Sequence, residues 1–352
     1  MPVTRGLFSG VLIMLATAAL GVGASGQVTL YAAAHEPTVR AVAEAFEKKT
    51  GQKVALSIDA DSGALAERVL GERGAPRADV VWVRDHAAAA RLASEGVLAA
   101  HESAALTGWP EAFRDGGRRW YGFALRARVL VFDARQPPNL APNPEKDTVP
   151  AEQMRQLYNP RFSDGAVIMA RPWSNAGARN QCAALAAAWD PDGAAAWAYQ
   201  MRRQQMRLVS TAGTAIASAA SGDAFAALAD SDEAWVAKAD GALIAWAALK
   251  FDRFKIDATL EKACGPLLMP AAAARVKGGP DPQRAGALLE FLLSPEAERI
   301  IASGPGRCVP MHPSIAHEFP ELKMDLTTAA SASALADFAQ PGLEAFARAL
   351  PE

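Results

Sequence analysis

The chain lacks the short motifs that identify several large enzyme classes. Its 352 residues contain no GxSxG nucleophile elbow, no HExxH zinc motif and no P-loop. The five histidines, His35, His86, His101, His312 and His317, stand in no recognisable nucleophile–base signature. A catalytic triad is a spatial arrangement, so sequence order alone does not exclude an enzyme, but it favours other functions.

The chain has few cysteines and a small net charge. The three cysteines, Cys182, Cys264 and Cys308, permit at most one intramolecular disulfide, and no CxxC pair or Cys/His spacing predicts a structural zinc site. The 36 Lys and Arg residues nearly balance the 38 Asp and Glu residues, and the net charge is −2. That balance argues against a nucleic-acid partner or an acidic membrane surface.

An apolar run of near-membrane length occurs only at the N-terminus. Arg5 is the only charge in residues 1–26, an apolar run follows at 7–22, and small residues close it at 24–26. This order is typical of a cleavable secretory signal peptide, whereas an uncleaved membrane anchor is disfavoured because the run is short and contains glycines. We therefore expect a mature chain that starts near Gln27 and is soluble outside the cytoplasm, in a compartment that permits disulfides.

Strand-like and helix-like segments alternate behind this leader. Short apolar runs predict strands, and apolar residues at helical spacing predict the helices between them. The first series has strands at 27–34, 52–59 and 78–83 and helices at 37–51, 62–74 and 85–96. The second has strands at 165–170, 207–210 and 224–229 and helices at 176–190 and 213–222, followed by a strand at 265–279 and a helical segment at 281–304.

This alternation predicts the architecture. Strands that alternate with helices form parallel sheets covered by helices on both faces. A long β-rich segment, residues 119–135, separates the two series. The sequence therefore predicts two α/β lobes joined by long strands.

Five stretches, taken in order, resemble one family of proteins. They are VTLYAAAHEPTVRAVAEAFEKKTG, ADVVWVRDHAAAARLASEGVLA, WYGFALRARVLVFD, LADSDEAW and FLLSPEAERIIASG. Together they resemble the ferric-iron-binding protein family (extracellular solute-binding protein family 1), whose members are periplasmic solute-binding proteins of ABC importers. The resemblance covers nearly all of the chain behind the leader.

This resemblance implies a fold and a partner. The fold is α/β and two-lobed, the type II periplasmic-binding-protein fold, in which each lobe is a mixed sheet flanked by helices and hinge strands join the lobes. The N-terminal lobe would comprise residues 27–123 and 268–315, and the C-terminal lobe residues 124–267 and 316–352, with the last helices packed on the second lobe. Such a protein is expected to be a monomer without a cofactor, to close on a small-molecule ligand like a hinge, and to deliver it to the membrane subunits of an ABC permease.

The chain departs from this family at its tyrosines. Iron binders of the family hold the ferric ion through adjacent tyrosines late in the second lobe, whereas Tyr31, Tyr121, Tyr158 and Tyr199 are never adjacent here. At the corresponding place stand LADSDEAW, residues 228–235, and ALIAWAAL. The first of these looks like the Thr-Asp-Thr-Asp-Asp run of another branch of the family.

The ligand is therefore expected to be a small organic or phosphate-bearing anion. The alternative is ferric iron, a hard cation that oxygen ligands suit, held by His35, Asp230, the neighbouring acids and a synergistic anion. An enzyme on the same scaffold is the third interpretation.

The acids of LADSDEAW are the first candidate site. Asp230 ends a predicted strand, and Asp232 and Glu233 enter the next helix. One reading is structural, because acids cap helix N-termini and are favoured by the helix dipole. One cap needs one residue, so we expect Ser231 or Asp232 to cap the helix, and Asp230, at the carboxyl end of a strand, to contact ligand.

Arginines supply the opposite charge. Arg126 and Arg128 are two residues apart on the long strand, so they share one face. Arg84 ends the VVWV run, beside Asp85. Their guanidinium groups match carboxylate and phosphate groups in geometry, although each could equally be solvated or paired with an acid.

Two further candidates follow predicted strands. Arg171 precedes PWSNAGARN, where Ser174 or Asn175 can cap a helix whose free N–H groups offer an anion seat. His35 follows the first strand, where the family's iron binders carry a ligating histidine, although a lone histidine is more often packed or capping.

Two remaining groups of residues have both a structural and a functional interpretation. Trp82, Trp173 and Trp235 stand near the candidate positions and are expected to pack in the core or to form apolar walls. The family places the segment after Cys308 near the strand that follows Cys264, so the resemblance implies a Cys264–Cys308 disulfide.

Overall fold

The computed structural model describes residues 26–135 except 60, residue 154, residues 157–158, residues 160–324 except 252–253, 256–260 and 263–264, residue 326 and residues 332–350. Residues 1–25 of the predicted signal peptide and Cys264 therefore lie outside the described residues. No helix within the described ranges is long and apolar enough to cross a membrane.

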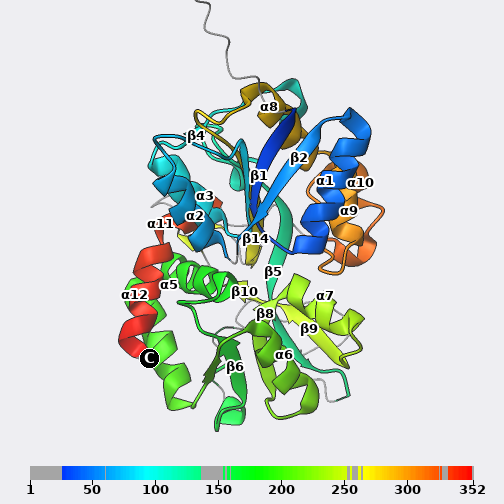
Figure 1. Cartoon of the computed structure of the whole chain (residues 1–352). Coiled ribbons are helices and arrows are strands. Elements are labelled where there is room, and N and C mark those ends of the chain that lie inside the picture. The colour runs from blue at the N-terminus through cyan, green and yellow to red at the C-terminus, as the bar shows by residue number, and fades with distance from the viewer. Residues whose placement is uncertain are drawn as a thin grey trace, which may run out of the picture.

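The upper lobe in Figure 1 contains three parallel strands. β1 (Gln27–Ala33) lies between β2 (Lys53–Ile58) and β3 (Val80–Val83) and pairs in parallel with both. The connecting helices are α1 (Glu36–Thr50), α2 (Ser62–Gly71) and α3 (His86–Ser94). The apolar spacing predicted for α1 is confirmed, because Val39, Val42 and Phe46 are buried. Gly51 ends this helix in the left-handed conformation, with φ of 72°.

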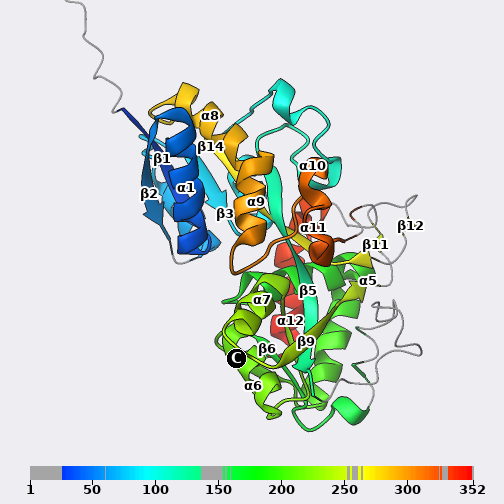
Figure 2. The same ribbon diagram turned by 90° about the vertical axis from the view of Figure 1, so that its right-hand side faces the viewer.

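Two long antiparallel strands join the upper and the lower lobe. β14 (Leu268–Val276) pairs with β3 on one side and with β5 (Tyr121–Asp133) on the other. Figures 1 and 2 show β5 running from one lobe into the other. The strand order is β2-β1-β3-β14-β5, followed by β8 (Ala226–Asp230), β6 (Val167–Ala170) and β7 (Arg207–Val209), which makes the sheet mixed. The mixed sheet implied by the resemblance is confirmed. The parallel pairing predicted from the alternation of strands and helices is confirmed for β1 with β2 and β3, whereas β5 and β14 pair antiparallel because they are hinge strands without crossover helices.

The lower lobe repeats the α/β pattern. β6 (Val167–Ala170) pairs in parallel with β7 (Arg207–Val209) and with β8 (Ala226–Asp230), and β5 pairs antiparallel with β8 and with β9 (Ile244–Ala248). Its helices are α5 (Ala176–Arg203), α6 (Ala212–Ser221) and α7 (Ser231–Ala239). The start of each of these three helices follows the carboxyl end of a parallel strand, as the strand–helix alternation predicts.

Two predicted helical segments differ from the structure. The first, predicted at 176–190, continues as α5 to Arg203 beyond a bend at Asp190, whose φ is 63°. The second, predicted over 281–304, is two helices, α8 (Pro282–Leu292) and α9 (Pro295–Ser303). The Ser294 hydroxyl accepts the Ala297 N–H at 3.3 Å and Pro295 opens α9, so a serine cap and a proline start a new helix there.

The C-terminal helices lie on the lower lobe and at the boundary between lobes. α12 (Ala339–Ala349) packs along α5, and a Cβ at Gly342 would overlap the backbone of Cys182, so the two helices approach closely. α11 (Ala332–Asp337) packs on α3 of the upper lobe and α5 of the lower. The predicted packing of the last helices on the second lobe is confirmed for α12, while the lobe boundaries at residues 123 and 267 stay predictions.

Short elements complete the described chain. They are β4 (Leu98–Ala99), β10 (Lys250–Phe251), β11 (Phe254–Lys255), β12 (Glu261–Lys262), β13 (Gly265–Pro266) and α10 (Pro313–Ala316), with 3-10 turns at Ala104–Leu106, Glu111–Phe113, Pro160–Phe162 and Pro320–Leu322.

Candidate functional site

A cleft of about 840 Å³ lies where the two lobes meet. His35 and Arg84 line it from the upper lobe, and Asp232 and Glu233 line it from the start of α7 in the lower lobe. Its longest wall is aliphatic and is formed mainly by Ile216, Ala217, Ala220, Val236, Ala237 and Leu243, from α6, α7 and the segment after α7. Arg135, paired with Asp133 at 2.7 Å, and Asp240 also line the cleft.

The helix α7 starts earlier in the chain than the sequence predicts. Asp230 is the N-cap residue, and α7 begins at Ser231. The Glu233 carboxylate turns back and accepts the backbone N–H of Asp230 at 3.2 Å. The Ser231 hydroxyl accepts the Ala127 N–H at 3.0 Å, so it ties α7 to β5. The prediction that Ser231 or Asp232 caps the helix is therefore wrong, because the strand ends at Asp230 as expected but the helix starts directly after it, so Asp230 itself is the N-cap residue.

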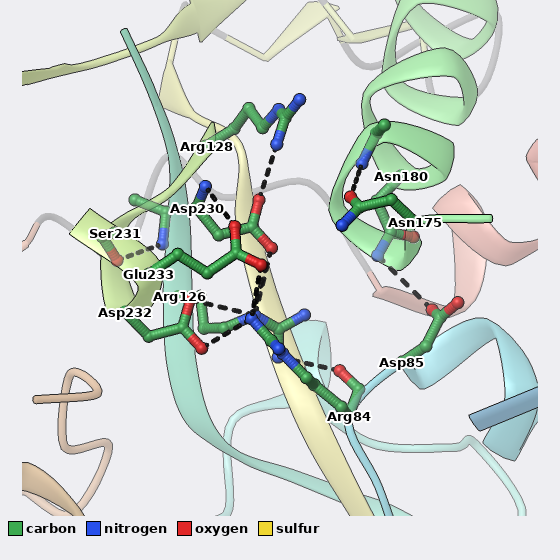
Figure 3. Close-up of polar contacts among 12 residues, drawn as sticks. Arg84, Asp85, Arg126, Arg128, Asn175, Asn180, Asp230, Ser231, Asp232 and Glu233 are labelled. Carbon is green, nitrogen blue, oxygen red and sulfur yellow. Dashed lines mark hydrogen bonds and ion pairs between the residues drawn. The ribbon is translucent and has the colours of Figure 1, made fainter. Parts of the chain in front are cut away.

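Asp230 lies in a buried ion cluster. The residue is 1% exposed, and its carboxylate is 2.9 Å from the Arg128 guanidinium and 3.5 Å from that of Arg126 (Figure 3). Arg128, which is fully buried, also donates to Gln181 at 2.8 Å and to the Leu228 carbonyl at 3.1 Å. The predicted shared face of Arg126 and Arg128 is confirmed, since both meet the same carboxylate. Contact of Asp230 with ligand stays a prediction, and the burial of its side chain does not favour it.

Arg84 joins the upper lobe to the acids of the lower lobe. Its guanidinium is 2.8 Å from Asp232, 3.4 Å from Glu233 and 3.9 Å from Asp230, while about a third of its side chain stays exposed (Figure 3). Its backbone carbonyl accepts a hydrogen bond from Arg126 at 2.8 Å. These contacts bring the predicted residues Arg84, Arg126, Asp232 and Glu233 together at the cleft.

The pKa values of this cluster follow from burial and mutual charge. Burial acts to raise the pKa of Asp230, but Arg128, Arg126 and Arg84 hold it below its usual value. Burial, helped by the negative charge of Asp230, raises the pKa of Glu233 to about 7 despite the opposing effect of Arg84. The acids around it raise the pKa of Arg84 against the effect of burial, so this guanidinium stays charged. The guanidinium groups and the carboxylates of the cluster therefore largely compensate one another's charge.

His35 is exposed on the rim of the same cleft. It stands at the N-cap of α1, where its Nδ1 lies 3.1 Å from the Thr38 hydroxyl. A ligand contact of His35 stays a prediction.

Asp85 takes a different position from its neighbour Arg84. It is 1% exposed and caps α3 by accepting the Ala87 N–H at 3.0 Å. Its carboxylate also accepts the Asn180 amide at 3.4 Å and lies 3.9 Å from Arg179, both on α5 of the lower lobe. Asp85 therefore connects the lobes on the α5 side of Arg84, and it does not line the cleft.

The segment before α5 does not reach the cleft either. Arg171 and Ser174 are exposed and line none of the described cavities. Asn175 caps α5 by accepting the Ala178 N–H at 2.9 Å, which confirms the predicted cap. A Cβ on Gly177, in the first turn, would overlap the Asp230 carboxylate. The side chain that faces the predicted anion seat is thus the protein's own Asp230, and ligand contacts of Arg171, Ser174 and Asn175 stay predictions.

The acids also form the one candidate cation site found among the described residues. One carboxylate oxygen from each of Asp230, Asp232 and Glu233 lies within 4.8 Å of the others. The guanidinium groups described above already compensate these charges. None of the four tyrosines lines the cleft, so a tyrosinate-bound metal has no support in this part of the structure.

Sequence reasoning missed a smaller pocket beside the cleft. It has a volume of about 60 Å³, and Trp82, Arg126 and Cys308 line it. Burial raises the pKa of the Cys308 thiol to about 12. Cys182 is buried in α5, as expected. Cys264 lies outside the described residues, so the Cys264–Cys308 disulfide stays a prediction.

Comparison with known proteins relates this chain to a protein family and to solved structures. Residues 28–304 match the family described as bacterial extracellular solute-binding protein. The chain is 28% identical over 180 residues, half of its length, to iron uptake protein A1 from Synechocystis, and 31% identical over 121 residues to the Fe(3+)-binding periplasmic protein of Serratia marcescens, 34% of this chain. The aligned stretches span 46% and 36% of those two proteins.

Solved structures match over nearly the whole chain. Iron-bound HitA from Pseudomonas aeruginosa aligns with a TM-score of 0.72 at 22% identity, over 93% of this chain and 100% of that one. The apo ferric ion-binding protein A of Pasteurella haemolytica aligns with a TM-score of 0.77 at 15% identity, also over 93% and 100%. AfuA from Actinobacillus pleuropneumoniae, with bound fructose-6-phosphate, aligns with a TM-score of 0.71 at 17% identity, over 92% and 98%. At these identities the likeness concerns the fold.

Proposed function

The chain belongs to the bacterial extracellular solute-binding proteins and has the two-lobed type II fold of periplasmic binding proteins, and on that premise we propose that it captures a small organic anion in the cleft between its lobes and delivers it to an ABC permease. Proteins of this family and fold bind solutes rather than transform them, and the named relatives are periplasmic. The protein itself is then a periplasmic monomer that needs no cofactor.

The make-up of the cleft wall carries this proposal. Small-molecule sites are mostly apolar, with a few polar groups that fix orientation. Here Arg84, Asp232 and Glu233 gather at one part of the cleft, and α6 and α7 offer an aliphatic wall beside them. Such a cleft suits an organic solute with a charged end and a carbon skeleton better than a bare ion.

The charge of the cluster favours an anion over a cation. Three guanidinium groups lie within 4 Å of the three carboxylates, and burial raises the pKa of Glu233 to about 7, which reduces its negative charge near neutral pH. A multiply charged cation would have to displace these arginines, whereas a carboxylate or phosphate meets Arg84 at an exposed edge.

Closure of the lobes would complete the site. Arg84 follows β3 in the upper lobe, and its partners Asp232 and Glu233 belong to α7 in the lower lobe. A solute that bonds to both sides favours the closed arrangement, with β5 and β14 as hinge strands. The permease would then recognise the closed form.

The test is native mass spectrometry of the protein purified without refolding. We expect one small organic anion retained per chain, and Arg84→Ala should weaken its retention by at least about tenfold, as loss of a bond to a charged group does. Arg171→Ala, an exposed arginine outside the cleft, is the matched control and should retain the solute. Equal retention in both variants, or stronger loss in Arg171→Ala, would place the ligand elsewhere.

Ferric iron is the second candidate. The three carboxylates of α7 lie close enough to share an ion, and the named relatives include an iron uptake protein and an Fe(3+)-binding protein. Without a tyrosine in the cleft we expect no visible tyrosinate-to-iron absorption after loading with ferric citrate. A coloured complex of one iron per chain would overturn the anion proposal.

A further inference from the structure

The 60 Å³ pocket opens beside the main cleft. The two cavities share four lining residues, His35, Arg84, Asp232 and Gly306. A cavity needs on the order of 10–15 Å³ to hold one water molecule, so this pocket has room for a group of a few atoms and not for a whole metabolite. It is therefore sized for one end of a solute whose remainder lies in the larger cleft.

Two residues that line this pocket carry buried donor groups without a hydrogen-bond acceptor among the described residues. Arg126 is 1% exposed and uses Nη1 for the Arg84 carbonyl, but its Nε and Nη2 make no hydrogen bond there. Nε has only longer ion-pair distances, 3.5 Å to Asp230 and 3.8 Å to Asp232. The indole N–H of Trp82, a residue that is 2% exposed, also lacks an acceptor, while its ring packs on Phe123 with centroids 5.0 Å apart.

One buried acceptor in the pocket is likewise unused. Asp232 gives Oδ2 to Arg84 at 2.8 Å, whereas its Oδ1 is buried and accepts no hydrogen bond within the described ranges. Buried polar atoms without partners are rare, and each calls for a water molecule, an ion or a ligand. Ordered water would serve while the cleft is empty, and a solute with matching groups would replace it without losing bonds.

The arrangement of donors identifies the chemistry. Nε and Nη2 form the side edge of a guanidinium, which presents two parallel N–H groups that match the two oxygens of a carboxylate. The Asp232 oxygen beside them requires a donor on the same solute, close to that carboxylate. A bare metal ion would find one free oxygen and a guanidinium instead, which does not form a metal site.

We infer that the pocket of Trp82, Arg126 and Asp232 binds a carboxylate whose neighbouring carbon carries an ammonium or hydroxyl group, the α-amino or α-hydroxy acid end of the solute. This inference rests on the proposed function and makes it more specific. Arg126 and Trp82 hold the carboxylate oxygens, and Asp232 accepts from the neighbouring donor. The side chains of Ala124, Ala271 and Ile301 form the apolar part of the wall, beside the carbon atoms.

A series of two-carbon probes tests this chemistry. Acetate, glycolate and glycine share one carboxylate and differ only in the group on the second carbon, and methylphosphonate presents a tetrahedral anion of similar size. Titration followed by NMR should show glycolate or glycine binding about tenfold more tightly than acetate, the effect of one hydrogen bond to a charged group. Equal affinity for acetate, or tighter binding of methylphosphonate, contradicts the inference.

Two variants assign the preference to the pocket. Trp82→Phe keeps an aromatic ring and removes the N–H. Acetate, glycolate and glycine should therefore all bind more weakly, while the order of their affinities is kept. Trp109→Phe is the matched control, because Trp109 is buried in the same lobe, donates to the Gly122 carbonyl at 2.9 Å and lines none of the described cavities. Asp232→Asn should remove most of the advantage of glycine over acetate. The assignment is overturned if the ratio of glycine to acetate affinity is unchanged in Asp232→Asn. It is also overturned if the affinity for the three carboxylates is unchanged in Trp82→Phe.

The pocket assignment and the proposed function can fail independently of each other. If native mass spectrometry finds a retained organic anion without a carboxylate next to a donor, the solute-binding proposal stands and this pocket assignment fails. The assignment also fails if none of the three carboxylates binds at the highest soluble concentration. If the carboxylates bind as expected but no solute is retained from the cell, the pocket chemistry stands and the transport proposal needs another ligand.

Discussion

The starts of α7 and α5 are two helix N-termini that the sequence presents as similar candidate sites, and the structure separates them. At α7 three acids meet three arginines from the long strand and the other lobe. At α5 the cap Asn175 bonds to its own helix and Arg171 is exposed. Free N–H groups alone therefore do not make a site. A site forms where strands from both lobes bring charged side chains to the same helix start.

The two helix starts are also in contact with each other. Gly177 in the first turn of α5 lies against the carboxylate of Asp230, which precedes α7. Asp230 thus sits between the two helices, with Arg128 and Gln181 completing the cluster. This contact assigns different roles to neighbouring acids. Asp230 holds the lower lobe together, and Asp232 and Glu233 face the cleft.

The largest effect is expected from Asp230→Ala. The change leaves Arg128, with no exposed surface, and Arg126 without their shared carboxylate, and breaking a buried ion pair costs about 3–5 kcal/mol. The free energy of unfolding, measured with urea, gives the loss. Asp61→Ala is the matched control, because Asp61 caps α2 in an exposed position and its removal should cost about 1 kcal/mol.

This expectation differs from the one drawn from the sequence, in which Asp230 contacts ligand. If Asp230→Ala is no less stable than Asp61→Ala but binds solute poorly, the sequence prediction was right. The division between a structural Asp230 and a cleft-facing Asp232 would then fail.

A second, slightly smaller effect tests the contact between the helices. Gly177→Ala introduces a Cβ that overlaps the buried Asp230 carboxylate and should cost about 3 kcal/mol, the upper range for overpacking. Gly213 occupies the same second position of α6, where a Cβ would meet only the Thr211 hydroxyl at 3.9 Å. Gly213→Ala should therefore be neutral or stabilise the protein. Equal stability of the two variants would show that α5 and Asp230 are not in contact.

The third effect is a dependence of stability on pH that arises from Glu233 at the start of α7. The pKa of Glu233 is about 7, above its unfolded value near 4.5, because of burial and of Asp230 and Asp232, with Arg84 and Arg128 opposing. An acid with a raised pKa binds its proton more tightly in the folded state, so it lowers stability as pH rises from about 4.5 to about 7. About a fifth of the Glu233 side chain is exposed, so solvent screens part of the effect. We therefore expect the charging of Glu233 to lower the free energy of unfolding by about 1–2 kcal/mol over this pH range.

Glu233→Gln isolates this contribution. The amide oxygen can still accept the Asp230 N–H, but the group no longer titrates, so the variant should lose less stability than the wild type between pH 5 and pH 8. Any remaining slope of the same sign has a source in Glu298, whose pKa burial also raises to about 7. Identical melting curves for the two proteins across this range would mean that Glu233 is charged throughout.

The sequence predicts the fold better than the role of each acid. Apolar spacing, helix-ending glycines and caps are local signals, and they place β1, α1 and most later elements within a few residues. His35, Arg84, Asp232 and Glu233 reach one cleft because each follows the carboxyl end of a strand. The burial of Asp230 depends on its pairing opposite Arg128, 102 positions away, and on the approach of Gly177. Such long-range register has no local sequence signal.

The smallest effect concerns the cap of α5. Asn175→Ala removes the acceptor for the Ala178 N–H and should cost about 1 kcal/mol of stability, as cap removals do. Thr211→Ala in α6 is the matched control, because Thr211 accepts the Thr214 N–H at 3.1 Å in the same way. Neither residue lines the cleft, so both variants should melt slightly earlier and retain solute like the wild type. Retained solute is measured by native mass spectrometry beside thermal unfolding. A selective loss of solute in Asn175→Ala would mean that the closed protein brings the start of α5 to the ligand after all, and that a helix N-terminus without opposing arginines contributes to this site.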